Sequence, residues 1–367
     1  MTNKGSVLPW GSPSFCFRLF FRLFFFGTCL VPLLYFLSMY GWGLYSDRRH
    51  IVTGNLTILL WHWPFGPSYS LEGDVCWDRY RIPGCRLVDQ RSLYPSADLV
   101  VFHHRELMTG QERLPFHLPR ARHQTWVWLS LESPDNNGDL KPFNNVFNWT
   151  MSYRRDADFT IPYGKLVAKD RDTGNYSSTQ GYIPKNKSPL ACWVVSHYNP
   201  QQKRSLVYNS LRKSIKVEVY GQLEGRVLAP SNLLPTISRC YFYLAFENSI
   251  SKDYITEKLW RNAYQAGAVP VVLGPPPDDY MAVAPPNSFI HIEDFPSTTE
   301  LGNYLSQLIV DKERYAGYFA WRRSHQVKVY TDWRERLCSI CSQHHILPAQ
   351  KVYRDLEAWV RWGHDVH

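Results

Sequence analysis

The sequence predicts an α/β protein with two domains, each built on a mainly parallel sheet. Short apolar segments alternate with helix-like segments along most of the chain after residue 55, a pattern typical of βα units. A polar stretch over residues 165–189, rich in Gly, Ser, Asn and Lys, interrupts this alternation and marks the domain boundary. Ligands of such sheets bind at the carboxyl ends of the strands, and a cleft between two domains suits two substrates.

The first domain is expected to contain four strands. Each is a short apolar run that ends in turn-forming or polar residues, and the first is followed by Pro64 and Gly66. The predicted strands are 55–63, 97–102, 124–131 and 156–162.

The second domain is expected to alternate strands and helices. Gly267 follows the helix at 253–266 directly, which suits a left-handed helix C-cap. The predicted strands are 191–196, 216–220, 239–246, 268–273 and 289–292, and the predicted helices are 203–211, 253–266, 298–309, 315–330 and 350–362.

An apolar, uncharged stretch over residues 23–45 is long enough to span about 30 Å of hydrocarbon. It is too long for a cleaved signal peptide, and no small-residue cleavage site follows it. We therefore predict a cytoplasmic tail at 1–22, a transmembrane signal anchor at 23–45 and a stem at 46–55. Glycosylation sequons at Asn148, Asn175 and, more weakly, Asn186 place the body of this single-pass type II protein beyond the membrane.

Six cysteines lie outside the anchor region, an even number that favours structural disulfides in an oxidising compartment. A zinc site is the alternative, but the gap between Cys76 and Cys85 is too long for a usual zinc knuckle. Long closed loops restrict the unfolded chain more than short ones, which favours bonds from the early cysteine pair to the late pair. The predicted bridges are Cys76–Cys338, Cys85–Cys341 and Cys192–Cys240.

The formal net charge of +9 favours anionic partners. The Lys and Arg residues are scattered and form no block, so we expect no nucleic-acid partner. A phosphate-bearing or sialylated substrate fits the charge, although a basic protein without such a substrate fits it equally well.

Residues 246–258 form the densest polar cluster of the sequence, at the point where a predicted strand gives way to a helix. The free N–H groups and positive end of a helix suit a phosphate there, and Lys258 adds a point charge. Glu247, Asn248 and Glu257 are placed to hold sugar hydroxyls. The alternative is a capped amphipathic helix with solvated charges, and the pattern alone favours neither.

Glu132 ends an apolar, Trp-rich strand. A carboxylate at the mouth of such a strand can act as a general base, although an ordinary strand-end carboxylate is the plainer interpretation.

His103 and His104 are candidates for a base, a metal ligand or a substrate clamp. Adjacent strand residues point to opposite faces, so the plainer expectation is one packed and one exposed histidine. Two Asp-x-Asp patterns, at 156–158 and 170–172, are common by chance, and we predict no metal site.

Residues 242–274 resemble the signature of the α-1,3-fucosyltransferases. The matching runs are FYLAFENS at 242–249, DYITEKLW at 253–260 and VPVVLG at 269–274. Supporting runs are FHHRE at 102–106, WVWLSLESP at 126–134, YRRDAD at 153–158 and WVVS at 193–196. The resemblance covers about residues 56–362. WHWPF at 61–65 and TDWRER at 331–336 look closest to the leukocyte-type (type seven) branch.

This resemblance implies a GT-B fold, in which two Rossmann-like domains face a cleft behind the transmembrane helix. The acceptor-binding domain is expected at 56–185, the GDP-fucose domain at 186–345 and a C-terminal helix at 346–367. It also implies a Golgi membrane protein with its catalytic domain in the lumen. No metal cofactor is obligatory, and a divalent metal is at most stimulatory.

The implied reaction is the inverting α-1,3 transfer of L-fucose from GDP-β-L-fucose to N-acetylglucosamine. The acceptors are sialylated lactosamine glycans on glycoproteins and glycolipids, and the products are sialyl Lewis x-type selectin ligands. Transfer to unsialylated lactosamine, or a non-catalytic glycan-binding protein on the same fold, are the alternatives.

The resemblance also implies a role for each matching residue. Glu132 is the base, Lys258 and Arg204 stabilise the departing diphosphate, and Glu257 lies beside the fucose ring. His103 and His104 are the acceptor-side candidates. The donor pocket is lined by Ser196, Tyr243, Asn248 and Tyr254.

Two features depart from the leukocyte-type pattern. His197 stands where many members have Asn, and residues 229–232 replace a short Cys-x-x-Cys. Cys192 and Cys240 instead match another branch, in which the corresponding cysteines pair. The family is therefore better defined than the need for a sialylated acceptor.

Overall fold

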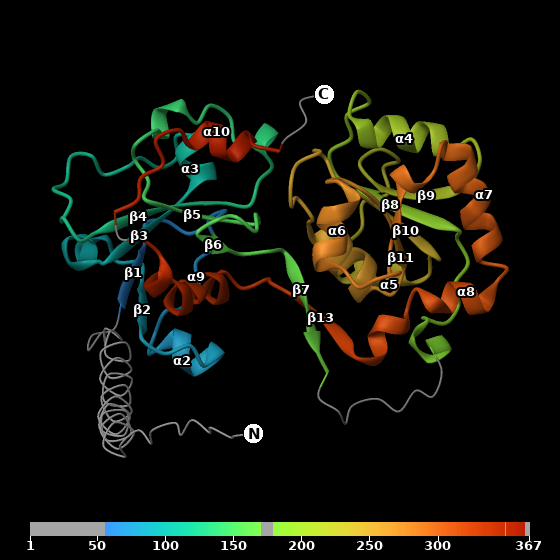
Figure 1. The fold of residues 1–367 in the computed structure, drawn as a ribbon, viewed down its shortest axis with the longest axis horizontal. Coiled ribbons are helices and arrows are strands. Elements are labelled where there is room, and N and C mark those ends of the chain that lie inside the picture. Colours follow the sequence, from blue (N-terminus) through green and yellow to red (C-terminus); the bar gives the residue numbers. More distant parts are fainter. Residues whose placement is uncertain (1–55, 170–178, 349, 364–367) are drawn as a thin grey trace, which may run out of the picture. The chain divides into compact units, whose positions relative to one another are not determined.

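The structure of the chain, a computed structural model, describes residues 56–169, 179–348 and 350–363 (Figure 1). The predicted tail, transmembrane segment and stem lie outside these residues, as do Asn175 and the Asp-x-Asp pattern at 170–172. Within the described ranges, no helix combines the length and apolarity needed to cross a membrane.

The first sheet has six parallel strands in the order β2-β1-β3-β4-β5-β6. Three of the predicted strands are confirmed as β1, β3 and β4, whereas the one predicted at 156–162 shrinks to the two residues of β6. The pattern did not predict β2 or β5. The bounds are β1 (Leu56–Leu60), β2 (Cys85–Val88), β3 (Leu99–His103), β4 (Thr125–Ser130), β5 (Trp149–Ser152) and β6 (Phe159–Thr160).

The first sheet is covered on both faces with the help of helices from the C-terminal part of the chain. α9 (Trp333–Gln343) contributes Leu337 and Ile340 to the core on one face. α10 (Leu356–Arg361) contributes Leu356 and Val360 to the core on the other. The chain therefore returns to the first sheet after building the second. The other α-helices here are α2 (Val75–Tyr80) and α3 (His104–Met108).

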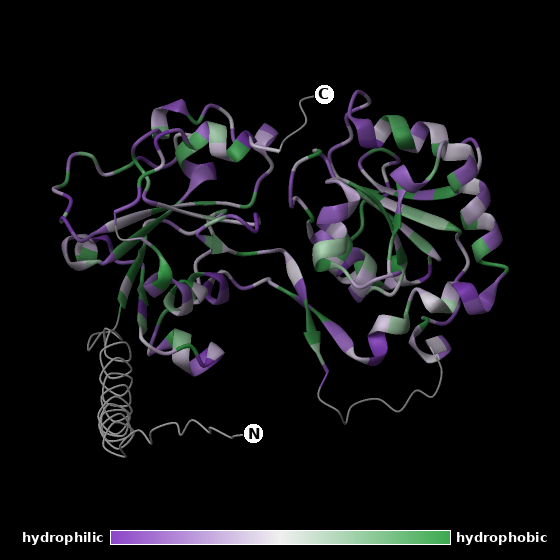
Figure 2. Ribbon diagram, viewed as in Figure 1, coloured by the Kyte–Doolittle hydropathy of each residue, from purple (hydrophilic) through white to green (hydrophobic). Residues whose placement is uncertain are grey.

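The second sheet has five parallel strands in the order β12-β11-β10-β8-β9. All five strands predicted for this domain are confirmed to within three residues at each end. Its central strands β8, β10 and β11 are apolar along their length (Figure 2), as expected of strands covered on both faces. The bounds are β8 (Ala191–Val195), β9 (Val217–Gly221), β10 (Phe242–Phe246), β11 (Val269–Leu273) and β12 (Ile290–His291).

Two predicted helices of this domain are confirmed, α4 (Lys203–Leu211) and α7 (Thr298–Leu308). The pattern missed α5 (Pro230–Ser238) and α6 (Pro277–Val283), both of which begin at proline. The short 3₁₀ helices are η1 (Arg91–Ser96), η2 (Pro134–Asn136), η3 (Lys141–Phe143), η4 (Thr179–Tyr182), η6 (Ile292–Asp294), η7 (Ala320–Arg323) and η8 (His344–Ile346).

The helix predicted over 315–330 is wrong. α8 (Lys312–Gly317) ends early, and β13 (His325–Val329) pairs antiparallel with β7 (Gly164–Ala168). The alternating side chains of His325–Val329 fit a two-residue period, which favours a strand. β7 overlaps the start of the polar stretch over residues 165–189 that was predicted as the domain boundary.

The helix predicted over 253–266 begins later than expected, as the π-helix η5 (Lys258–Gln265). It ends before Gly267, whose φ of +82° suits the expected left-handed cap. The helix predicted over 350–362 is reduced to α10.

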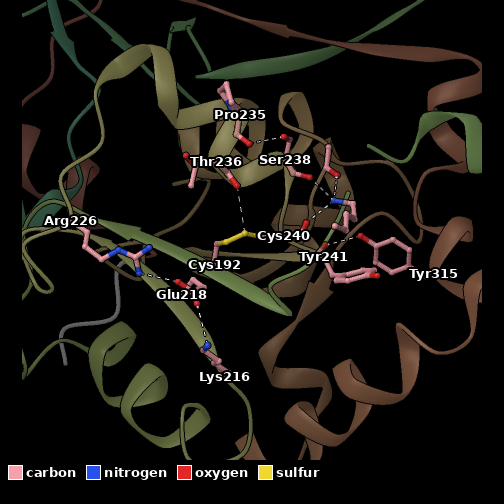
Figure 3. The surroundings of a disulfide bond; sticks show 12 residues. Cys192, Lys216, Glu218, Arg226, Pro235, Thr236, Ser238, Cys240, Tyr241 and Tyr315 are labelled. Atoms are coloured by element: carbon pink, nitrogen blue, oxygen red, sulfur yellow. Dashed lines mark hydrogen bonds and ion pairs between the residues drawn. A yellow bond between two sulfur atoms is a disulfide. The ribbon is translucent and has the colours of Figure 1, made fainter. Parts of the chain in front are cut away.

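The disulfides join Cys76 to Cys338, Cys85 to Cys341 and Cys192 to Cys240, the same pairs that the sequence favours. The first two fasten α9 to α2 and β2, at the edge of the first sheet. The third joins β8 to Cys240, two residues before β10 (Figure 3).

The two bridges to α9 predict non-additive effects on stability. Loss of Cys76–Cys338 alone leaves Cys85–Cys341 to hold the same two segments together, so the unfolded chain gains little freedom. Loss of both opens a loop with a sequence separation of 262, which we expect to lower the free energy of unfolding by about 3–5 kcal/mol. Urea unfolding of Cys76→Ala/Cys338→Ala, Cys85→Ala/Cys341→Ala and the quadruple variant measures this, and simple additivity would contradict it.

Candidate active site

Glu132 and Arg204 line one cavity of about 530 Å³. Glu132 lies two residues beyond β4 in the first sheet, and Arg204 lies in the first turn of α4, beside the second sheet. A neighbouring cavity of about 350 Å³ shares Arg204 and Asn248 and adds Glu247. Residues beyond the carboxyl ends of strands in both sheets thus line these two adjoining cavities.

The backbone at Glu132 is held while its carboxylate faces the cavity. The Glu132 N–H donates to Ser130 Oγ at 3.2 Å, and Asn137 Nδ2 donates to its carbonyl at 3.3 Å. Within the described residues, the carboxylate accepts a single hydrogen bond, of 3.4 Å from Asn136 Nδ2. It is therefore free to take a proton from a substrate hydroxyl, which is what a general base must do.

Arg204 is buried and fixed by its neighbours. Its Nε donates to Gln202 Oε1 at 2.8 Å, and its Nη2 donates to the carbonyl of His197. Burial lowers the pKa of Arg204, and the charge of Glu247 opposes that shift. An arginine remains protonated in proteins, so this guanidinium presents a fixed positive charge that suits a phosphate.

Lys258 lies in a buried network at the end of β10. Its Nζ is 2.7 Å from Glu247 Oε2, 2.9 Å from Thr256 Oγ1 and 3.4 Å from Glu257 Oε1. Burial alone lowers the pKa of Lys258, but the two carboxylates outweigh it and raise the pKa above its usual value. Lys258 is thus a cation held behind Glu247, and Glu247 lines the smaller cavity.

The four donor-pocket candidates have different surroundings. Asn248 lines both cavities, and its buried Oδ1 has no partner within the described residues, so it can accept a hydrogen bond from a ligand. Ser196 is exposed just after β8. Tyr243 is buried in a core beside the second sheet, and its hydroxyl accepts a hydrogen bond from Asn262. Tyr254 is buried in the core of the first sheet.

Both acceptor-side histidines are buried, with 1% of each residue exposed, so the expectation of one exposed histidine is wrong. His103 closes β3, and its Nδ1 lies 2.5 Å from Glu106 Oε2. His104 opens α3, and its Nε2 donates to the carbonyl of Asn137 at 2.7 Å. His104 therefore lines the Glu132 cavity, and its Nδ1 has no partner in the described part of the chain.

The sequence pattern missed His62 and Glu106. His62 Nε2 lies 3.4 Å from Glu106 Oε2, and the N–H of Phe65 donates to Glu106 Oε1 at 2.9 Å. Burial raises the pKa of Glu106, but the hydrogen bond and charge of His103 outweigh this and bring it to about 2. The signal for this cluster was a glutamate three residues after His103, beside an aromatic run at 61–65.

An aromatic-lined cavity of about 640 Å³ covers this cluster; its lining includes Trp61, Trp63 and Phe65. Phe65 has a φ of +61°, and half of it is exposed. Arg105 lies over the Phe65 ring and lines both this cavity and that of Glu132. Aromatic faces beside charged groups suit a saccharide, which has apolar faces and polar edges.

The remaining candidates serve structural contacts. Asp156 pairs with Arg154 at 2.8 Å, and Asp158 pairs with Lys351 at 2.6 Å. Asn148 accepts from the N–H of Trp126 and donates to the carbonyl of Lys351, whereas Asn186 is exposed. The described residues contain no group of three or more His, Cys, Asp or Glu that suits a metal ion.

A candidate base and a fixed guanidinium that face one cavity, at the carboxyl edges of two parallel sheets, define a group-transfer enzyme with two substrates. The model "Fucosyltransferase, N-terminal" matches residues 53–164, and "Glycosyltransferase family 10 (fucosyltransferase) C-term" matches residues 184–359. The chain belongs to glycosyltransferase family 10 and is an α-1,3-fucosyltransferase.

Individual relatives agree with this assignment. Alpha-(1,3)-fucosyltransferase 7 of Rattus norvegicus is 49% identical over 83% of this chain and 79% of its own length. The Homo sapiens protein of that name is 46% identical over 83% and 86%. 4-Galactosyl-N-acetylglucosaminide 3-alpha-L-fucosyltransferase 9 of Bos taurus is 42% identical over 83% and 81%.

A crystal structure of an alpha1,3-fucosyltransferase with GDP-fucose shares the fold. It covers 82% of this chain and 93% of its own, with a TM-score of 0.50 and 18% sequence identity.

The burial of His104 predicts a pH dependence of stability. Burial lowers the pKa of His104 from 6.5 to about 4, so the unfolded chain binds more protons between these values. The contribution of His104 to the free energy of unfolding is therefore fully present above pH 6.5. It is lost as the pH falls towards 4, which lowers the free energy of unfolding by up to roughly 3 kcal/mol. Urea unfolding across this range compares the wild type with His104→Gln, whose curve should be flatter; equal slopes would contradict the prediction.

Proposed function

We propose that the protein transfers L-fucose from GDP-β-L-fucose to the 3-hydroxyl of N-acetylglucosamine, with inversion, in α-2,3-sialylated lactosamine. The products are sialyl Lewis x-type glycans. The observation that carries this proposal is the shared cavity of Glu132 and Arg204, which puts a base and a phosphate-binding cation within reach of the same two substrates.

In the proposed reaction, Glu132 takes the proton of the 3-hydroxyl as its oxygen bonds to C1 of fucose. The bond from C1 to the β-phosphate oxygen breaks, and GDP leaves with the electron pair. Arg204 and Lys258 offset the charge that develops on the diphosphate, and the carboxylate of Glu257 stabilises the positive charge on the sugar ring. No step needs a metal ion, and a divalent metal is at most stimulatory.

The proposed donor site lies on the second domain of a GT-B fold. Asn248 supports it directly, because its unpartnered Oδ1 borders the cavity beside Arg204. Ser196 binds the nucleotide at the mouth of β8. Tyr243 and Tyr254 are both buried and line neither cavity, so we assign them to the support of the donor site from within the core.

The proposed acceptor site extends from the Glu132 cavity into the aromatic-lined cavity. Arg105 connects the two and is exposed. Its guanidinium lies over the Phe65 ring and makes no hydrogen bond or ion pair with the residues the structure describes. An unpaired cation there favours an acidic glycan. The 42% identity to a type 9 enzyme favours unsialylated lactosamine as the alternative acceptor. The presence of Glu132, Arg204 and Lys258 disfavours a non-catalytic glycan-binding protein.

We also propose a single-pass type II protein of the Golgi membrane, with this catalytic part in the lumen and its acceptors on glycoproteins and glycolipids. The three disulfides support an oxidising compartment.

Replacement of Glu132 by Gln is expected to lower kcat by at least about 100-fold, because the amide cannot take the proton. The affinity for GDP should not change, since Glu132 lies on the first sheet. Initial rates and calorimetric GDP binding test this on the purified full-length chain. Glu313→Gln, an exposed carboxylate on α8, is the control, and a Glu132→Gln enzyme with near wild-type kcat would remove the base assignment.

The choice of acceptor is tested with labelled GDP-fucose and lactosamine, with and without α-2,3-linked sialic acid. We expect transfer to the sialylated acceptor, because the junction of the two cavities carries the unpaired Arg105. Transfer to unsialylated lactosamine alone would establish the alternative acceptor. A folded protein that binds GDP and transfers to neither would establish the glycan-binding protein.

A further inference from the structure

A loop of the second domain, residues 251–254, is inserted against the first sheet. Tyr254 is buried in the core of the first sheet, with its ring centroid 5.0 Å from that of Tyr153. Lys252 Nζ lies 3.5 Å from Asp156 Oδ2, and its N–H donates to the carbonyl of Gly363 at 3.0 Å. The loop that leads into η5 is therefore shaped by contacts outside its own domain.

Arg155 is the centre of these contacts. It follows β5 of the first sheet, and its N–H and Nε donate to the carboxylate of Asp253 at 3.0 and 2.5 Å. Its Nη2 donates to Asp279 Oδ1 at 2.6 Å, in α6. The N–H of Asp253 donates to the other oxygen of Asp279 at 2.8 Å. The three residues form a closed ring, here called the arginine clamp.

The arginine clamp differs from an ordinary surface ion pair. The side chain of Arg155 is 44% exposed, but those of Asp253 and Asp279 are only 4% and 12% exposed. Removal of a cation from buried carboxylates leaves uncompensated charges. Without the guanidinium, Asp253 keeps only the backbone N–H of residue 155 from the clamp, and Asp279 keeps only the N–H of Asp253. Asp253 also has a φ of +61°, a conformation that needs support from its surroundings even for aspartate.

The clamp is continuous with the proposed phosphate-binding network. The N–H of Ile255 donates to the carbonyl of Asp253 at 2.8 Å. The N–H and Oγ1 of Thr256 then donate to Glu247, at 2.8 and 2.9 Å to Oε1, and both Glu247 and Thr256 Oγ1 contact Lys258 Nζ. The backbone conformation at Asp253 thus sets where Thr256 stands, and Thr256 holds the carboxylate that holds Lys258.

We propose that Arg155 is a positioning residue for the donor: from the first sheet, it holds the Asp253 loop in the shape that places Thr256, Glu247 and Lys258 for GDP-fucose. This inference rests on the proposed function, because it assigns the Lys258 network to the donor diphosphate. It makes donor affinity depend on a side chain of the domain that does not bind the donor.

Replacement of Arg155 by Met keeps most of the apolar stem and removes the side-chain bonds of the clamp to Asp253 and Asp279. The expected result is a rise on the order of tenfold in KM for GDP-fucose and in the Kd for GDP, with KM for the acceptor unchanged. Arg155→Lys reaches one carboxylate instead of two and should restore part of the affinity. A purely structural role would lower the melting temperature and leave these affinities unchanged in the protein that remains folded.

The control is Arg226→Met. Arg226 is 49% exposed and pairs with Glu218 of β9 at 2.9 Å (Figure 3). The Arg226→Met variant therefore loses an arginine–carboxylate ion pair that lies away from the clamp. Calorimetric GDP binding, donor and acceptor KM and thermal unfolding are measured on the purified full-length chain. Lys258→Ala provides the reference for loss of the network cation.

If Arg155→Met does not fold, Asp279→Asn removes half of the clamp and keeps an acceptor for the Asp253 N–H; it should weaken GDP binding by a smaller factor. Wild-type GDP affinity in folded Arg155→Met or Asp279→Asn overturns the inference and leaves the proposed function standing. A wild-type protein that binds no GDP overturns both.

Discussion

A parallel sheet presents apolar side chains on both faces, and both must be covered. The segment from β1 to β6 does not supply enough helix to cover the first sheet. α9 and α10 complete the two cores, although both follow the second sheet in the chain. This crossing back joins the two sheets into one compact unit over residues 55–367, and it allows Glu132 and Arg204 to line one cavity.

The active-site charges are arranged by the same topology. Parallel strands bring their carboxyl ends to one edge, so Glu132 after β4 and Glu247 after β10 both reach the cavities. Their surroundings give them different tasks. Glu132 has one long hydrogen bond and is available to a substrate, whereas Glu247 is saturated by Thr256 and Lys258. One carboxylate can exchange a proton, and the other holds a cation in place.

The sequence predicts those parts of the fold in which local pattern and tertiary role agree. Apolar runs such as β3 and β10 are recognisable because they are buried on both faces. α9 is not recognisable, since its buried positions include Arg334 and Arg336. The partners of these arginines include the carbonyls of Ser70 and Ile161, which lie far away in sequence. The site follows the same rule. Glu132 stands out at the end of a strand, whereas Glu106 gains its role from His62, which lies on another strand's end.

Because α9 lies late in the sequence, the first domain can form its two disulfides to α9 only late in synthesis. Cys76 and Cys85 emerge early, but their partners Cys338 and Cys341 appear only when almost the whole chain has been made. The first domain therefore cannot complete its core by itself as it leaves the ribosome, unlike domains that fold one after another from the N-terminus. In an oxidising compartment, its two free thiols remain open to exchange throughout elongation. Premature bonds between them must be reversed by thiol–disulfide exchange before α9 can dock.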